Sequence, residues 1–159
     1  MNLFDEFLAI AREFQRAGIP YATVGGVALA IHDEPRFTRD IEILVTPEHL
    51  EDARVALQHL SYFESSAPWT FAQTQLTLHR FMKTEGEDFL VVDILCGSHP
   101  RHREIVRRAT QEPWSGGLAS VANKDDLIWM KEQRASEQDR VDIARLRNDQ
   151  DRKSSPTAE

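Results

Sequence analysis

Acidic residues stand inside the two most apolar extended segments of this chain. Residues 40–45 (DIEILV) are rich in β-branched side chains yet include Asp40 and Glu42, and residues 89–96 (FLVVDILC) are interrupted by Asp93. Burying an unpaired carboxylate costs several kcal/mol, so strand interiors normally exclude acids. The fold must therefore provide these carboxylates with solvent or with a partner.

Strand geometry predicts where these acids point. Side chains alternate between the two faces of a sheet, so Asp40 and Glu42 project from one face and the apolar residues between them pack on the core. If the two segments are neighbours, Asp93 joins them, and three like charges repel unless a cation shares them. Mg²⁺ is the natural partner because it binds carboxylates and keeps room for phosphate oxygens. The alternative is that Asp40 precedes the strand, Glu42 faces solvent and Asp93 forms a salt bridge.

The rest of the chain alternates helical and extended patterns. This predicts a single α/β or α+β domain over residues 1–147, with a small mixed β-sheet flanked by helices, and a flexible polar tail over 148–159. The expected elements are a helix from residue 3 to about 17, a strand at 21–24, a helix at 27–31, a strand at 40–45, a helix after 47, a hairpin of 70–82 and 89–96, a helix from 98 to 109, a loop at 111–117, a brief strand at 120–121, and a C-terminal pair of helices beginning at 123 and 136.

Composition excludes several classes of protein. The 159 residues include 26 acidic and 19 basic side chains, a net charge of −7, which argues against extensive wrapping of nucleic acid. Residues 99–108 (HPRHREIVRR) nevertheless predict a local basic patch, Arg101 to Arg108, which would bind tRNA or a triphosphate. The alternative is an ordinary solvated helix face. A single cysteine, Cys96, excludes a disulfide framework and is expected to be buried. No signal peptide or membrane span is recognisable, so we expect a cytoplasmic protein with no membrane partner.

Two glycines follow the first short strand and precede a helical segment. Gly25 and Gly26 would let the backbone approach a ligand closely, and the N–H groups that begin the helix would face it. This is the outline of a phosphate-binding turn, although an ordinary tight turn has the same signature.

The stretch 24–45 (VGGVALAIHDEPRFTRDIEILV) resembles the signature of the DNA polymerase β-like nucleotidyltransferase superfamily. It is most similar to the short bacterial branch that includes abortive-infection and toxin–antitoxin nucleotidyltransferases. A third acid on a later strand and a helical segment such as 126–131 (DLIWMK) followed by 139–143 (DRVDI) are also part of that pattern. The matching residues of the first motif are Gly25, Gly26, Ala28, His32, Arg36, Thr38, Asp40 and Glu42.

The resemblance implies transfer of a nucleoside monophosphate from an NTP to an acceptor hydroxyl on tRNA, a protein or a small molecule, with Mg²⁺ or Mn²⁺ as cofactor. It implies that Asp40 and Glu42 hold the metal ions and that Asp93 binds the acceptor-side ion and accepts the hydroxyl proton. An antitoxin or a second copy of the chain is the implied partner. The residues implied to contact the nucleotide are Gly25, Gly26, Arg36, Thr38 and Lys131, with Asp142 orienting them. Lys131 is also implied to be catalytic, as a cation for the phosphates.

Three departures from the pattern support an alternative. Asp33 follows His32 where glycine is expected, the commoner Gly-Ser is Gly25-Gly26, and the second acid is Glu42 instead of aspartate. The alternative is a catalytically inactive nucleotide-sensing or protein-interaction module with the same fold, and a third hypothesis is an acidic adaptor. The transferase hypothesis requires that the three acids meet. It also requires that a divalent ion has room among them, which an arginine bound to one of the acids would take away.

Overall fold

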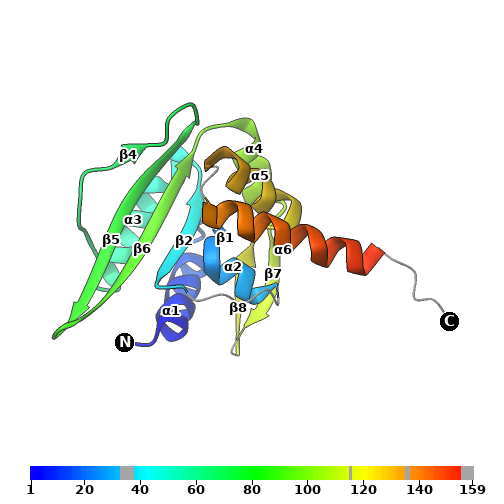
Figure 1. The fold of residues 1–159 in the computed structure, drawn as a ribbon. Helices are drawn as coiled ribbons and strands as arrows, with labels where there is room; N and C mark the ends of the chain where they lie inside the picture. Colours follow the sequence, from blue (N-terminus) through cyan, green and yellow to red (C-terminus); the bar gives the residue numbers. More distant parts are fainter. Residues whose placement is uncertain (33–37, 115, 135–136, 155–159) are drawn as a thin grey trace. The chain divides into compact units, whose positions relative to one another are not determined.

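The computed structural model describes residues 1–32, 38–114, 116–134 and 137–154, which belong to two compact units (Figure 1). The first unit, Met1–Asn123, contains the sheet and the helices α1 to α4. The second unit, Lys124–Glu159, contains the helices α5 (Lys124–Arg134) and α6 (Glu137–Ser154). Each unit is described by itself below.

Eight strands of the described residues form one mixed sheet, in the order β3-β5-β6-β2-β1-β8-β7 with β4 paired to β5. The pairs β2–β6 and β1–β8 are parallel and the others are antiparallel. A small mixed sheet flanked by helices is therefore confirmed. The strands are β1 (Ala22–Val24), β2 (Asp40–Val45), β3 (Phe63–Glu64), β4 (Trp69–Thr70), β5 (Leu76–Glu85), β6 (Asp88–Gly97), β7 (Thr110–Trp114) and β8 (Gly117–Val121).

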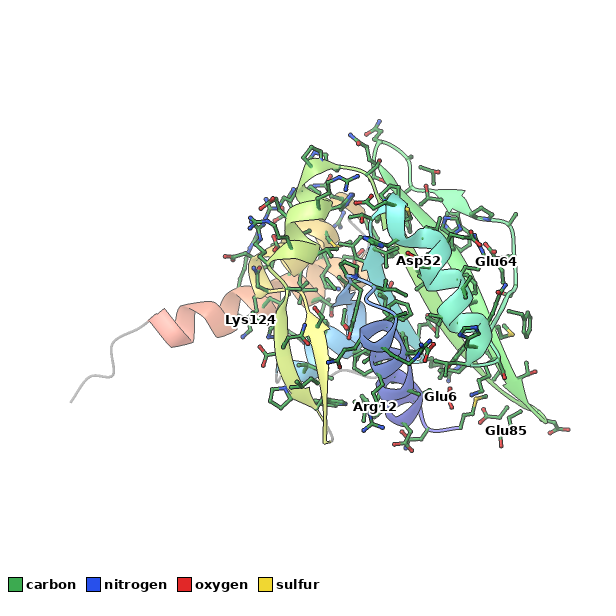
Figure 2. The ribbon with its side chains drawn as sticks, turned by 180° about the vertical axis from the view of Figure 1, so that it is seen from behind. Glu6, Arg12, Asp52, Glu64, Glu85 and Lys124 are labelled. Atoms are coloured by element: carbon green, nitrogen blue, oxygen red, sulfur yellow. The ribbon has the colours of Figure 1, made fainter. Side chains whose placement is uncertain are left out.

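Helices α1 (Leu3–Arg16) and α3 (Leu50–His59) cover one face of the sheet and lie in front of it when the molecule is seen from behind (Figure 2). On β5, Lys83 donates to Glu6 of α1 at 3.1 and 3.2 Å, so the odd-numbered side chains of β5 point to this face. The same face carries the row Phe81, Val92 and Ile41, each at most 1% exposed. The apolar side of β2 is therefore in the core, as the alternation predicts.

The remaining helices of the first unit connect the strands. They are α2 (Gly25–Ile31), the 3₁₀ turn η1 (Pro47–His49) and α4 (Pro100–Arg107). Within the described residues, every helix is too short or too polar to cross a membrane.

Two local predictions differ from the structure. Residues 111–117 are expected to be a loop, but 111–114 belong to β7 and Gly117 begins β8, which pairs with it. Strand β7 lies at the edge of the sheet and consists of mostly polar, exposed residues, so it lacks an alternating apolar pattern, and an edge tolerates Pro113. Helix α6 continues to Ser154, through the first part of the predicted tail. The predicted hairpin of β5 and β6 is confirmed, with a shorter turn at Gly86 and Glu87.

Candidate active site

A row of charged side chains crosses three neighbouring strands on the face opposite α1. The register pairs Arg80 of β5 with Asp93 of β6, and Asp93 with Glu42 of β2. Residues directly opposite one another in neighbouring strands project from the same face. We call Arg80, Asp93 and Glu42 the charged row; Asp40 lies two residues before Glu42 on the same face of β2.

Arg80 binds Asp93 through two parallel hydrogen bonds. Its Nε donates to Oδ1 at 2.9 Å and its Nη2 donates to Oδ2 at 3.0 Å, while Asp93 is only 2% exposed. The guanidinium also lies 5.3 Å from the ring centroid of Trp69 on β4, within cation–π distance. The hydrogen bonds to Asp93, and the charges of Asp93, Asp40 and Glu42, raise the pKa of Arg80. The salt-bridge alternative for Asp93 is therefore what the structure shows.

The two glycines of β1–α2 leave space for side chains of the site. A Cβ atom on Gly25 would lie 1.8 Å from Oε2 of Glu42, so the Glu42 carboxylate lies against the Gly25 backbone, whose φ is +69°. A Cβ atom on Gly26 would lie 2.6 Å from Cβ of Thr38. Their assignment as a phosphate-binding turn stays a prediction, and the structure supplies a steric reason for glycine at both positions.

Thr38 and His32 hold the backbone on either side of the gap between α2 and β2. The Thr38 hydroxyl donates to the carbonyl oxygen of Asp40 at 3.1 Å and accepts from the Asp40 N–H at 3.4 Å. His32, at the end of α2, is 2.8 Å through Nε2 from the carbonyl oxygen of Ala122. Asp33 and Arg36 lie outside the described residues.

The three acids, as arranged, do not fit a shared divalent ion. Both oxygens of Asp93 accept hydrogen bonds from Arg80. Across the described parts of the chain, no three histidine, cysteine, aspartate or glutamate side chains are placed so that they could hold a metal ion together. Asp40 and Glu42 are half-buried and have the oxygen donors that Mg²⁺ prefers. Arg80 therefore supplies positive charge where a metal ion was predicted.

The second unit contains its own ion-paired cluster. The Lys131 ammonium donates to Asp142 at 3.0 Å and lies 3.8 Å from Asp139, which also accepts from Arg134 at 3.1 Å. Lys131 and Asp142 are almost completely buried. The two residues predicted to serve the nucleotide are thus bonded to each other, and a phosphate-binding role of Lys131 stays a prediction.

The predicted basic patch on α4 is partly neutralised by acids. Arg103 forms an ion pair with Glu48, and Arg107 forms one with Glu104 on the preceding helical turn. At the start of the helix, His99 accepts from the Arg101 N–H at 2.9 Å, and the His99 N–H donates to Nδ1 of His102 at 3.2 Å. Arg103 and Arg107 of this patch are therefore engaged by carboxylates of this chain.

Sequence reasoning missed Arg80 and Trp69. The signal for Arg80 was available in the hairpin: a two-residue turn at Gly86 and Glu87 pairs Glu85 with Asp88, and counting back along both strands places Arg80 opposite Asp93. The predicted hairpin, with strands at 70–82 and 89–96, leaves a longer connection and so left this register open. Nothing local signals Trp69, because β4 has only two residues.

Comparison with known proteins supports the class of fold. No family model matches the sequence, and no curated protein sequence matches it. Among solved structures, a protein of Thermotoga maritima assigned as a nucleotidyltransferase superposes with a TM-score of 0.62 at 11% identity, over 94% of this chain and 92% of that one. The antibiotic-resistance factor ANT(2″)-Ia, in complex with adenylyl-2″-tobramycin, gives a TM-score of 0.52 at 13% identity, over 92% of this chain and 98% of that one. The chain therefore has the nucleotidyltransferase fold.

Proposed function

We propose that this chain is a nucleotidyltransferase that moves a nucleoside monophosphate from an NTP to an acceptor hydroxyl. The observation that carries the proposal is that Asp40 and Glu42 share one face of β2 and that Glu42 lies against Gly25, within a fold shared with nucleotidyltransferases. The condition set by the sequence is not met at Asp93, which Arg80 occupies, so the proposal rests on two acids and not on three. The adenylylated small molecule bound to ANT(2″)-Ia is chemistry of the proposed class.

Asp40 and Glu42 are the proposed ligands of a Mg²⁺ or Mn²⁺ ion, which when bound would neutralise phosphate charge. Glu42 lies against Gly25, so a nucleotide held by the N–H groups of Gly25 and Gly26 would have its phosphates beside these acids. The proposal includes further residues that would contact or orient the nucleotide: Arg36, Thr38, Lys131 and Asp142. Asp93 is unavailable while Arg80 holds it, so we assign it no step.

The acceptor and the partners are a further part of the proposal. The candidate acceptors are a small molecule, a protein hydroxyl and tRNA; tRNA would use the patch Arg101 to Arg108 and is the least favoured of the three, because Arg103 and Arg107 are paired with acids. A toxin–antitoxin role would add an antitoxin partner, and a second copy of the chain is the other proposed partner.

The Arg80–Asp93 pair favours a second candidate function. A chain whose third acid is permanently bound by an arginine would bind a nucleotide without transferring it, and would act as a nucleotide-sensing or protein-interaction module. The difference between the two functions is turnover.

The test is incubation with each of the four labelled NTPs and Mg²⁺ or Mn²⁺, with and without bulk RNA, while pyrophosphate release and label transfer are measured. We expect turnover that Asp40→Asn reduces at least a hundredfold. Asp52→Asn is the control, because Asp52 is an exposed acid on α3, against the other face of the sheet. NTP binding without turnover would establish the non-catalytic module, and absence of nucleotide binding would contradict both.

A further inference from the structure

We propose that Arg80 is a built-in cation of the acidic site, which competes with divalent ions and weakens their binding while its guanidinium holds Asp93. The inference rests on the proposed function only for the choice of a divalent ion as the competing ligand. It makes Arg80 a positioning residue that determines when the carboxylates are available.

The geometry of the pair suits a cation that is held firmly. The planar guanidinium matches the carboxylate with two hydrogen bonds of 2.9 and 3.0 Å, an arrangement that a lysine ammonium cannot reproduce. Asp93 is almost fully buried, so its charged form needs a partner of opposite charge. The guanidinium also lies 5.3 Å from the ring centroid of Trp69 on the neighbouring strand β4, which adds a cation–π contact to the two hydrogen bonds.

The charges around Arg80 explain why it competes with a metal ion. Its neighbours in the charged row and Asp40 are the same acids that a divalent ion would bind, and their attraction contributes to the raised pKa of Arg80. An ion placed among them would be repelled by the guanidinium, and Coulomb repulsion over a few ångströms at a protein surface weakens binding by at least about tenfold. The Arg80 side chain is 37% exposed, so it has a route into solvent that leaves β5 paired.

The experiment measures Mn²⁺ affinity by the loss of the free-ion EPR signal, with the full chain and no nucleotide. We expect Arg80→Gln to bind Mn²⁺ at least about tenfold more tightly than the unsubstituted protein. Lys83→Gln is the matched control, because Lys83 is on the same strand, is bound to a glutamate on α1, and faces the other way. Unchanged or weaker binding by Arg80→Gln would overturn the proposal.

Two further variants separate release of Asp93 from a general change of charge. Arg80→Gln combined with Asp93→Asn should lose most of the gained affinity if Asp93 becomes a ligand once it is released; a double variant as tight as Arg80→Gln would contradict that role. If Arg80→Gln does not fold, Arg80→Lys keeps Asp93 paired through fewer hydrogen bonds and should tighten Mn²⁺ binding several-fold. Unchanged Mn²⁺ binding by Arg80→Lys would also overturn the proposal.

Tight Mn²⁺ binding by a variant that never turns over NTP would refute the transferase proposal and leave this inference intact.

Discussion

Gly25 is in contact with the candidate site through Glu42. Its left-handed backbone conformation ends β1 and begins α2, and the Glu42 carboxylate fills the space that any Cβ atom would need. Glycine at this position therefore satisfies a conformational and a steric requirement together. Gly18 has nearly the same φ, +68° against +69°, but nothing within 4 Å of a Cβ atom built there. The pair offers a way to separate backbone strain from displacement of Glu42.

We expect Gly18→Ala to lower the free energy of unfolding by about 1–2 kcal/mol, because it places an alanine at positive φ, and Gly25→Ala to lower it by more, because it also displaces the Glu42 carboxylate. Only Gly25→Ala has to move the Glu42 carboxylate, so only this variant should reduce NTP turnover, by at least about tenfold. Urea denaturation and the turnover assay measure the two effects. Equal activity of the two variants would show that the position of Glu42 is irrelevant to the reaction.

At the scale of single elements, the start of α4 is stabilised by two histidines. His99 caps the helix, and the Nδ1 atom of His102 accepts the His99 N–H, which requires a neutral ring with its proton on Nε2. Burial, together with the charge of His99, lowers the pKa of His102 to about 4. Protonation of His102 would remove the acceptor of this capping hydrogen bond.

The lowered pKa of His102 predicts a loss of stability in acid. In the unfolded chain the ring titrates near pH 6.5, so the contribution is fully present above about pH 6.5 and is lost as the pH falls towards 4. We expect the free energy of unfolding to decrease over this interval by roughly 2–3 kcal/mol more than in His102→Asn, whose side-chain oxygen still accepts a hydrogen bond. Denaturation curves at pH 7, 5.5 and 4 measure it; parallel pH profiles would contradict the assignment.

The helices α5 and α6 are joined by the Lys131–Asp142 pair. Removing one member of a buried ion pair leaves an uncompensated charge, so we expect Lys131→Met to lower the free energy of unfolding by about 3–5 kcal/mol. The double variant Lys131→Met with Asp142→Leu should recover most of this loss, as thermal unfolding would show. If the stable double variant also keeps NTP turnover, Lys131 has no role in phosphate binding.

On the scale of the whole molecule, the acidic balance opposes binding of nucleic acid. The net charge is −7, and two arginines of the α4 patch are engaged by Glu48 and Glu104. Phosphate contacts require unneutralised basic side chains. The patch therefore provides less positive charge than its sequence suggests.

We expect no measurable binding to bulk RNA at about 0.15 M salt, as measured by fluorescence anisotropy. The variant Glu48→Gln with Glu104→Gln should gain affinity by roughly tenfold at low salt, because it releases Arg103 and Arg107. Its control, Glu13→Gln with Glu51→Gln, makes the same change in net charge away from α4: it releases Arg16 of α1, while Arg54 of α3 keeps its ion pair with Glu64. Equal gains would assign the effect to net charge, and firm binding by the unsubstituted protein would refute the prediction.

Local pattern alone was enough to predict much of this molecule. The alternation within 40–45 places the isoleucines in the core and Asp40 with Glu42 on the other face, because adjacent strand residues point in opposite directions. The local sequence also predicts most of the helices and the β5–β6 hairpin. It does not predict the β7–β8 hairpin, because an exposed edge strand has no apolar periodicity.

The partners of the acids depend on contacts between segments far apart in the chain. Whether Asp93 meets a metal ion or a guanidinium is set by the register of β5 against β6 and of β6 against β2, and by the short strand that brings Trp69 beside Arg80. A shift of one residue in any of these pairings would turn the side chain to the opposite face. The faces of the strands thus follow from neighbouring residues, whereas the identity of the cation in the site follows from the assembled sheet.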